Sequence, residues 1–503
     1  VRSVLLACLA GVLYFLGFIG FGVWPLVFVF WAVLLVAIEG RTPRQALGLG
    51  ALAGFVALCG GYYWVIHLLQ AFAHLSWPLG FVLLNIYQGF SMGLMAWLVA
   101  RAHRDLGVHP GWALPVALVA VTWIYPYLFP SFIAASFLHV PWLNQIADLG
   151  GAYLVDGLVA LVNGALYALV SWRRHAPGRR ALRLPMVAAA ALAATLLYGG
   201  VRVLQVDAWL DEARTLEVAL IQSNLGARDK TAKRRAFLER HQMMSRAAIV
   251  AHPETELVVW PESAFNYAIH RARRSVGQDI TRGVPRPVLS GAITVERVDG
   301  ERRVYNSAVL TSSTGEIRGI FDKVRLLHFG ETLPFVDVFP QIREWFPRSV
   351  GFERGSSFAH FELEDGTKLL PMICYEDIIP SFVREMWSRG GAAHALVNVT
   401  NDSWYGDTHE PKIHLALATL RSIETRRSLI RSTNTGISAV VDPAGRIMKR
   451  TGQWTQEVLH AEVPLVDDES STVYMVLGDW PAYVALVLVL AGALVARRRR
   501  PRS

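Results

Sequence analysis

Cysteine is scarce in this sequence, which has only 3 among its 503 residues. Cys8 and Cys59 lie in long apolar runs, so the chain offers no framework of disulfide bonds. The sequence has 15 histidines, but none belongs to an HExxH pattern or to a Cys/His cluster. We therefore expect neither a metal site nor a cofactor.

Charged residues are also scarce, at 18% of the chain, whereas 53% of the residues are hydrophobic. This composition is too apolar for a soluble multidomain protein and indicates membrane-spanning segments. The net charge of +9 does not indicate nucleic-acid binding, because arginines beside apolar runs account for it. These arginines are Arg173, Arg174, Arg179, Arg180 and Arg183, with Arg497 to Arg500 and Arg502 near the C-terminus.

About eight apolar segments are long enough, or nearly so, to cross a bilayer as helices. They cover residues 3–19, 23–38, 46–69, 79–100, 111–129, 151–172, 184–203 and 480–496. The loops near 20–22, 70–78 and 130–150 contain no Lys or Arg, whereas the alternate loops and both chain ends are basic. Because cytoplasmic loops carry the excess of Lys and Arg, we expect both termini in the cytoplasm. Four polar residues lie inside these segments, namely Asn85, Gln88, Asp156 and Asn163. Such residues can mark a functional site, but for the Asn and Gln residues we expect interhelical hydrogen bonds.

The sequence divides into a membrane domain of seven helices (1–203), an outer domain (204–479) and an eighth helix with a basic tail (480–503). The outer domain contains no apolar run of membrane-spanning length. Short strand-like runs alternate in it with helical patterns at Lys233–Val250 and Ile413–Ile430, which indicates a layered α/β domain. The runs include Leu216–Gln222, Leu257–Trp260, Val288–Ile293, Val304–Leu310, Leu369–Cys374, Ala395–Val399, Ile437–Val441 and Val458–Val463.

Three strand-like runs of this domain end on a reactive or charged residue, namely Glu262, Lys323 and Cys374. A thiol must ionise to attack a carbonyl group, and a carboxylate can accept its proton. An ammonium group can stabilise both the thiolate and a developing oxyanion, with the backbone N–H of Tyr375 as a second donor. The residues alone leave two alternatives open: Cys374 as an inert core cysteine, and Glu262 with Lys323 as a structural ion pair.

Four ordered motifs contain or follow these residues. They are Trp260-Pro-Glu-Ser263, Asp322-Lys323 followed by Phe329-Gly-Glu331, Met372-Ile-Cys-Tyr-Glu376, and Asn401-Asp-Ser-Trp-Tyr-Gly406. The motifs resemble those of the nitrilase (carbon–nitrogen hydrolase) superfamily. With the apolar segments around them, the chain resembles the membrane branch of that superfamily, the apolipoprotein N-acyltransferase family of Gram-negative bacteria. The resemblance implies a multi-pass α-helical membrane bundle of about eight spans and an extracytoplasmic α/β nitrilase-like αββα sandwich.

The resemblance also implies roles for individual residues. Glu262 is expected to be the general base, Lys323 the cation that stabilises the oxyanion, and Cys374 the nucleophile. Glu331 matches a second glutamate that lies near the site in the family. It either supports catalysis or orients a loop, and the two roles are equal alternatives. The remaining matches are Asn306 near the lysine, Tyr375 and Glu376 beside the nucleophile, and Trp404 and Tyr405, which line an acyl site or are core aromatics.

The sequence departs from the family pattern outside the three catalytic positions. The arm Asn224–Thr231 lacks the tryptophan often found there, and His328 stands where a proline is usual. Ile413-His414 replaces a common Gln-His pair, and Arg426-Arg-Ser428 replaces Gly-Arg-Pro. These differences bear on substrate contacts more than on the chemistry.

The predicted function is a two-step acyl transfer in the bacterial inner membrane. As the resemblance implies, Cys374 takes an acyl chain from a phospholipid as a thioester. It then passes the chain to the α-amine of the N-terminal diacylglyceryl-cysteine of an apolipoprotein, the last step of lipoprotein maturation, with ping-pong kinetics. The expected partners are the phospholipid donor, the apolipoprotein acceptor and the membrane, with the catalytic domain in the periplasm; a monomer is the default expectation.

Two alternatives belong to other functional classes. A membrane-tethered nitrilase-like amidase would use the same three residues on a small amide, with water or a small amine as acceptor. A catalytically silent membrane scaffold would keep the fold alone, although the presence of all three reactive residues argues against it. About eight spans, where one would suffice as an anchor, favour the acyltransferase.

Overall fold

The computed structural model describes residues 1–72, 77–175, 182–226, 234–333, 336, 338–346, 351–467 and 471–499. The chain forms two compact units. The helical unit comprises Val1–Val65, Pro78–Leu204 and Thr472–Ser503, and the α/β unit comprises Ile66–Trp77 and Gln205–Ser471. The basic residues Arg179, Arg180, Arg500 and Arg502 lie outside the described residues.

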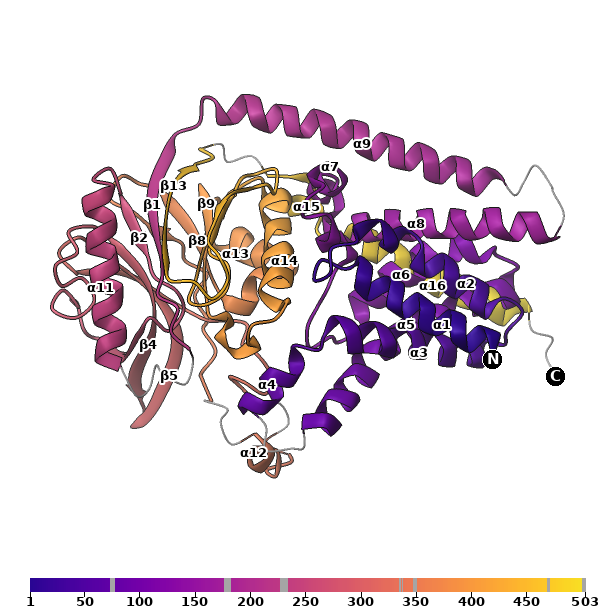
Figure 1. The fold of residues 1–503 in the computed structure, drawn as a ribbon, viewed down its shortest axis with the longest axis horizontal. Coiled ribbons are helices and arrows are strands. Elements are labelled where there is room, and N and C mark those ends of the chain that lie inside the picture. Colours follow the sequence, from indigo (N-terminus) through magenta and orange to yellow (C-terminus); the bar gives the residue numbers. More distant parts are fainter. Residues whose placement is uncertain are drawn as a thin grey trace. The chain divides into compact units, whose positions relative to one another are not determined.

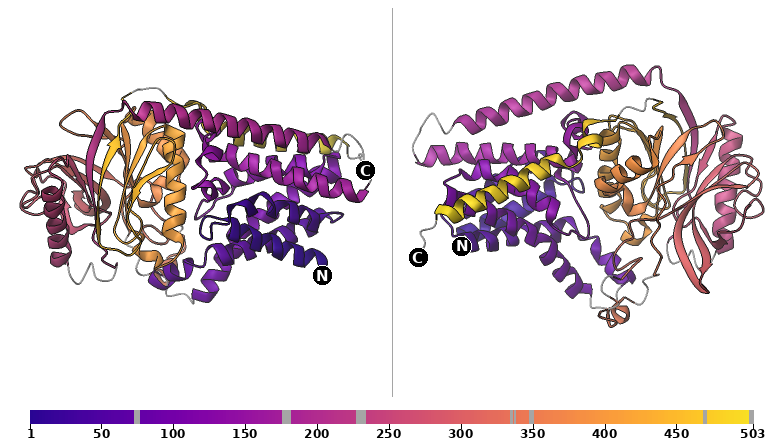
Figure 2. Two further views of the ribbon diagram at one scale, coloured as in Figure 1. Left: turned by 45° about the horizontal axis from the view of Figure 1, so that its top comes forward. Right: turned by 180° about the vertical axis from the view of Figure 1, so that it is seen from behind.

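The helical unit is built from apolar helices, and each apolar segment expected from the sequence overlaps one of them (Figure 1). They are α1 (Arg2–Gly17), α2 (Phe30–Ile38), α3 (Pro43–Gly61), α5 (Trp77–Leu106), α6 (Pro110–Ile124), α8 (Ala147–His175), α9 (Arg183–Leu210) and α16 (Trp480–Arg499). The segment expected over 46–69 is divided, because α3 ends at Gly61 and a separate helix begins at Val65. Shorter helices are α7 (Pro141–Asn144) and α15 (Val473–Leu477), with 3-10 turns at η1 (Trp24–Phe28) and η2 (Ile133–Phe137). Helix α16 packs on α6 and α8, although it lies far from them in sequence (Figure 2).

Among the described residues, 5 helices are long and apolar enough to cross a membrane. They are Pro43–Gly61, Trp77–Leu106, Ala147–Trp172, Arg183–Leu210 and Trp480–Arg499; Arg2–Gly17, Trp24–Ile38 and Pro110–Ile124 are shorter apolar helices. The helical, apolar character of this region is confirmed, and the number of helices that cross a bilayer stays a prediction.

Polar side chains inside the bundle satisfy backbone groups of neighbouring segments. Asn163 accepts a hydrogen bond from Ala32 N at 3.1 Å and donates one to Val27 O at 2.9 Å, which joins α8 to the η1–α2 segment. Asp156 accepts bonds from two backbone N–H groups of η2, and Gln88 does the same for the segment that follows α6. Asn85 departs from the expected interhelical role, because it donates to Phe81 O of its own helix at 2.9 Å.

Two β-sheets pack face to face in the α/β unit. The first, of 7 strands, has the order β13 (Glu457–Pro464), β1 (Thr215–Gln222), β2 (Leu257–Val259), β4 (Val288–Val298), β5 (Glu301–Thr311), β6 (Ile317–Asp322), with β3 (Phe265–His270) paired to β4. The second, of 6 strands, has the order β12 (Ile447–Arg450), β11 (Ala439–Val441), β10 (Ser428–Thr433), β9 (Ala395–Thr400), β8 (Lys368–Ile373), β7 (Phe361–Glu362).

Helices cover the outer faces of both sheets, which gives four layers (Figures 1 and 2). Helix α11 (Arg234–Ala251) covers the first sheet, and α13 (Pro380–Gly390) and α14 (Glu410–Thr425) cover the second. The remaining elements are α4 (Val65–Phe72), α12 (Ile342–Trp345) and the 3-10 turns η4 (Cys374–Ile378) and η5 (Asp402–Tyr405). The αββα sandwich expected from the sequence is therefore present.

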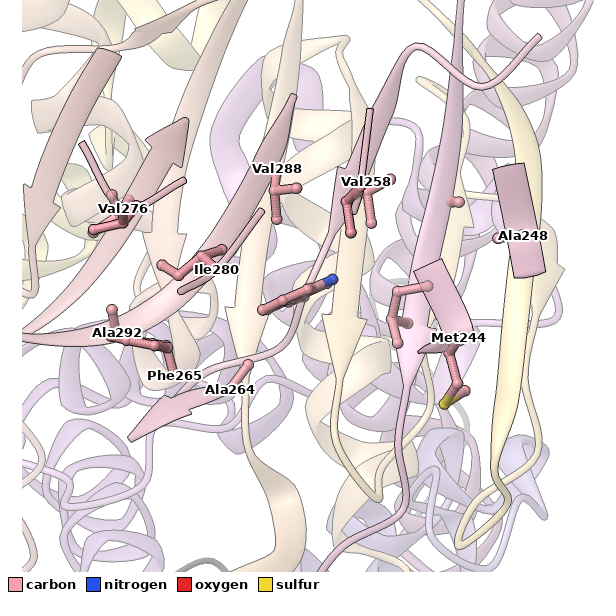
Figure 3. Packing of buried hydrophobic residues seen from close by; sticks show 14 of the residues in the cluster. Met244, Ala248, Val258, Ala264, Phe265, Val276, Ile280, Val288 and Ala292 are labelled. Carbon is pink, nitrogen blue, oxygen red and sulfur yellow. The ribbon is translucent and has the colours of Figure 1, made fainter. Parts of the chain in front are cut away.

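A hydrophobic cluster fixes α11 on the first sheet (Figure 3). Met244 and Ala248 of the helix pack with Val258 of β2 and Val288 of β4. Trp260 is fully buried at the end of β2, and its indole N–H donates to Ser245 Oγ at 2.9 Å. Because full burial of a large apolar side chain contributes about 1.5–3 kcal/mol, this cluster anchors the end of β2 that precedes Glu262.

The prediction of a helix over Ile413–Ile430 is wrong at the C-terminal end, because the helix ends earlier than predicted. Helix α14 ends at Thr425, where Arg426 adopts the left-handed conformation with φ of 53°, and strand β10 begins at Ser428. The apolar residues after Arg426 fit a fully buried strand as well as a helix, and pairing with β9 and β11 decides for the strand. The other helical pattern, at Lys233–Val250, corresponds to α11.

Candidate active site

The three residues singled out at strand ends lie together in the α/β unit. Glu262 follows β2, Lys323 follows β6 directly, and Cys374 follows β8 directly. All three are buried, with Lys323 only 2% exposed. Lys323 Nζ lies 3.5 Å from Glu262 Oε1, and its charge also acts on the thiol of Cys374. Both sheets thus supply one cluster of a carboxylate, an ammonium group and a thiol.

Glu331 and Asn306 complete this cluster. Glu331 Oε2 lies 2.8 Å from Lys323 Nζ and accepts a hydrogen bond from Leu327 N at 2.8 Å. The amide of Asn306 donates to Glu262 Oε1 and to Glu331 Oε1, each at 2.7 Å. Asn306 therefore holds the two carboxylates on either side of the lysine, and Glu331 contacts the ammonium group while also orienting its own loop.

The electrostatics of the cluster keep the lysine charged. Burial acts to lower the pKa of Lys323, but the charges of Glu331 and Glu262 outweigh it and raise the pKa well above its ordinary value. A permanently charged ammonium group suits the stabilisation of an oxyanion, because it needs no proton at the moment of reaction.

Cys374 is held in a backbone conformation that residues other than glycine rarely adopt. The strand ends at Ile373, and Cys374 opens the turn η4 with φ of +50°, instead of being the last strand residue as predicted. Strain of this kind costs about 1–3 kcal/mol and persists only where the surroundings fix it. Asn398 contributes by donating to Cys374 O at 3.2 Å. Burial, with a smaller contribution from the Glu262 charge, raises the pKa of the thiol well above its ordinary value, whereas Lys323 lowers it.

Glu376 fixes the turn behind the nucleophile. Its carboxylate accepts hydrogen bonds from Ile373 N at 2.8 Å, Val324 N at 2.7 Å and Arg325 N at 2.9 Å. The glutamate thus joins the strand end that carries the cysteine to the segment after the lysine, and burial raises its pKa to about 7. Its neighbour Tyr375 is largely buried, and burial raises the pKa of its phenol.

The two aromatic residues of the Asn-Asp-Ser-Trp-Tyr motif lie in the turn η5. Tyr405 is buried and close enough to Cys374 and Glu262 for their charges to raise the pKa of its phenol, after burial as the main cause. Trp404 is half-buried. In the arm that lacks a tryptophan, residues 227–231, Thr231 included, lie outside the described residues.

A buried network of charges beneath Cys374 was not predicted from the sequence. His414 of α14 lies between two carboxylates, with Nε2 2.9 Å from Asp377 Oδ1 and Nδ1 3.0 Å from Asp402 Oδ1. Arg431 of β10 contacts the same two aspartates and donates to Asn398 Oδ1 at 3.1 Å. The network therefore links η4, η5, α14 and β10 to the asparagine that bonds the carbonyl of Cys374. The sequence did contain one indication of this network, because Asp402 belongs to the Asn-Asp-Ser-Trp motif.

The network favours a charged imidazole over a metal ligand. Asp402, Glu410 and His414 converge as ligands of a metal ion can. However, both ring nitrogens of His414 face a carboxylate, which fits two N–H donors and leaves no lone pair for a metal. Burial and Arg431 act to lower the pKa of His414, and the two aspartates raise it to about 10.

This pKa predicts how the stability of the α/β unit changes with pH. The folded pKa of His414, about 10, lies above the ordinary 6.5, so its stabilising contribution is complete below pH 6.5 and is lost as the pH rises through 10. We expect the free energy of unfolding to fall by up to roughly 1.4 kcal/mol per pH unit across this window. His414→Gln should be less stable than the wild type at pH 6.5 and close to it at pH 10. Thermal unfolding of both proteins in detergent measures this, and a constant difference at every pH would contradict it.

Comparisons with known proteins place the chain in a family. The model for the apolipoprotein N-acyltransferase N-terminal domain matches residues 10–165, and the carbon-nitrogen hydrolase model matches residues 284–470. The chain is 30% identical to an apolipoprotein N-acyltransferase from Geobacter metallireducens over 514 residues, which cover 99% of this chain and 96% of the relative. The chain belongs to the apolipoprotein N-acyltransferase family.

A second relative agrees with this assignment. An apolipoprotein N-acyltransferase from Rhodopseudomonas palustris is 29% identical, over 99% of this chain and 96% of the relative. The crystal structure of Saccharomyces cerevisiae Nit3, a member of branch 10 of the nitrilase superfamily, covers 57% of this chain and 97% of that chain, with 19% identity and a TM-score of 0.38.

Proposed function

We propose that this protein transfers an acyl chain from a membrane phospholipid to the α-amine of the N-terminal diacylglyceryl-cysteine of apolipoproteins. The cluster of Cys374, Lys323 and Glu262 carries this proposal, because it joins a nucleophile, a cation and a carboxylate in one buried site. Family membership over 99% of the chain supports the choice of substrates. This enzyme then catalyses the last step of lipoprotein maturation.

The first half-reaction forms a thioester on Cys374. Because burial keeps the resting thiol protonated, Glu262 accepts the thiol proton as the sulfur attacks the acyl ester carbonyl. Lys323 and the backbone N–H of Tyr375 stabilise the oxyanion of the tetrahedral intermediate. When the intermediate collapses, the ester C–O bond breaks, Glu262 returns the proton to the leaving oxygen, and a lysophospholipid is released.

The second half-reaction transfers the acyl chain to nitrogen. The α-amine of the acceptor attacks the thioester carbonyl, and the same oxyanion donors stabilise the second intermediate. Glu262 takes a proton from the amine, the C–S bond breaks, and the thiolate is reprotonated. The products are an amide and a free thiol, so that the enzyme follows ping-pong kinetics.

Asn306, Glu331 and Glu376 are positioning residues in this scheme. The first two hold Glu262 and Lys323, and the third fixes the turn that carries Cys374. We assign Trp404 and Tyr405 to the acyl-binding part of the site, since both belong to the turn η5 and Tyr405 interacts with Cys374.

The proposed setting is the bacterial inner membrane, crossed about eight times, with both termini in the cytoplasm. Residues 1–203 and 480–503 then form the membrane part, and residues 204–479 form a periplasmic catalytic domain. The distribution of Lys and Arg supports this orientation, and the five long apolar helices support several crossings. We propose a monomer that takes both of its substrates from the membrane.

A reconstituted assay tests the proposed function. The purified protein is mixed with vesicles whose phospholipid carries a labelled acyl chain and with a synthetic peptide that begins with diacylglyceryl-cysteine. We expect labelled N-acyl peptide and an equal amount of lysophospholipid, both identified by mass spectrometry. Labelled free fatty acid without N-acyl peptide, or hydrolysis of small amides in its place, would favour the membrane-tethered amidase and overturn the proposal.

A further inference from the structure

One buried hydroxyl beside the nucleophile has no role in the mechanism described above. Thr400 is the last residue of β9, the parallel neighbour of β8. Ile373 pairs with Val399 across these strands, so Thr400 stands at the next position, beside Cys374. The strand register therefore brings a hydroxyl to the side of the sulfur.

The surroundings of Thr400 offer its hydroxyl no partner except the thiol. The side chain is fully buried, and apart from the sulfur of Cys374, whose pKa the hydroxyl lowers, its oxygen has no hydrogen-bond partner among the described residues. By contrast, the hydroxyl of Thr433, the residue opposite Thr400 in the paired strand β10, donates to Gln222 Oε1 at 3.1 Å. A buried hydroxyl that lacks a partner is costly, and one at an active site calls for an explanation.

The chemistry of the thiol supplies that explanation. A neutral thiol is a weak acceptor, whereas a thiolate is charged and accepts strong hydrogen bonds. We propose that Thr400 donates its hydroxyl hydrogen to the sulfur of Cys374 when the thiol ionises, and so stabilises the thiolate that attacks and that later leaves the thioester. This inference rests on the proposed function, since it assigns Thr400 to the same nucleophile.

Other groups around the sulfur have different effects. Glu262 and Asp402 bring negative charge and raise the pKa of the thiol, whereas Lys323 and the Thr400 hydroxyl lower it. Tyr405 and Arg431 also interact with the thiol. Arg431 is already engaged by two aspartates, and Lys323 by two glutamates. The neutral hydroxyl thus adds a donor that is not tied to a carboxylate.

Alkylation of Cys374 tests this inference without using either substrate. In a Cys8→Ala, Cys59→Ala background, the rate of reaction with iodoacetamide is followed against pH. For Thr400→Val, which keeps the shape and removes the hydroxyl, we expect the midpoint of the profile to rise by about one to two pH units. Acyl transfer should fall by about 10- to 100-fold. Thr400→Ser should restore both values.

Thr311→Val is the matched control, because Thr311 is equally buried but donates to the backbone carbonyl of Val288 at 3.0 Å. It should lower the midpoint of thermal unfolding and leave the alkylation profile unchanged. A wild-type alkylation profile for folded Thr400→Val overturns the inference, even if acyl transfer is lost. Full acyl transfer by a Cys374→Ala variant would instead overturn the proposed function, so the two failures are distinguishable.

Discussion

Cys374→Ala is expected to abolish N-acylation, with a loss of at least about 10⁴-fold in kcat/KM, because no other group can form the acyl-enzyme. Release of lysophospholipid should stop as well, since the first half-reaction needs the same sulfur. Alanine removes only the sulfur, and the rest of the buried site keeps its hydrogen bonds. The reconstituted assay with labelled phospholipid measures both products.

The control for this substitution is Cys59→Ala. Cys59 is a free cysteine in the apolar helix α3 and has no role in the proposed chemistry. Its substitution should leave both products unchanged. If Cys374→Ala released lysophospholipid at the wild-type rate, the covalent mechanism would be wrong.

Glu262→Gln should reduce the rate of acyl transfer by about 10²–10⁴-fold, the range typical for loss of a general base. Glutamine still accepts the hydrogen bond that Asn306 donates to Glu262 Oε1 at 2.7 Å, so the site keeps its shape. It cannot take a proton from the thiol, whose pKa is raised by burial. We therefore expect the remaining activity to increase with pH as the thiol ionises without help.

A surface carboxylate provides the comparison for Glu262. Glu364 is largely exposed, lies 3.6 Å from Arg318 and has no role in the proposed chemistry. Glu364→Gln should transfer acyl chains at the wild-type rate over the whole pH range. A Glu262→Gln protein that did the same would show that this glutamate is only part of an ion pair with Lys323.

The three reactive residues stand at the ends of apolar runs, so the sequence could place each of them near the end of a strand. An apolar run of strand length can be recognised in a sequence, and its last residue is delivered to an edge of the sheet. Glu262, Lys323 and Cys374 were each located in this way, and the structure brings them together. Whether they would meet could not be deduced from spacing, and only the resemblance of the motifs indicated it.

The backbone conformation of Cys374 could not be predicted in the same way. Local preferences put a cysteine after an apolar run into the strand, but the residue has φ of +50°. This conformation depends on contacts from distant segments, among them the hydrogen bonds that Val324 N donates to Glu376 and that Asn398 donates to Cys374 O. Tertiary contacts of this kind override local preference.

The buried charges beneath the site were missed for a related reason. The helix predicted to run to Ile430 concealed strand β10, and with it the place of Arg431 in the second sheet. His414 belongs to no recognisable ligand or catalytic pattern in the sequence, so nothing there indicates its buried partners. A buried arginine or histidine is stable only with partners, and those partners, Asp377 and Asp402, come from turns that cannot be aligned from sequence alone.

The mass of the protein after incubation with phospholipid alone tests the central claim most directly. With acceptor peptide absent, the account predicts that the wild type gains the mass of one acyl chain, located on the peptide that contains Cys374. Addition of diacylglyceryl-cysteine peptide should remove this mass and yield N-acyl peptide in equal amount. An unmodified Cys374, in a protein that nevertheless forms N-acyl peptide, would contradict the account.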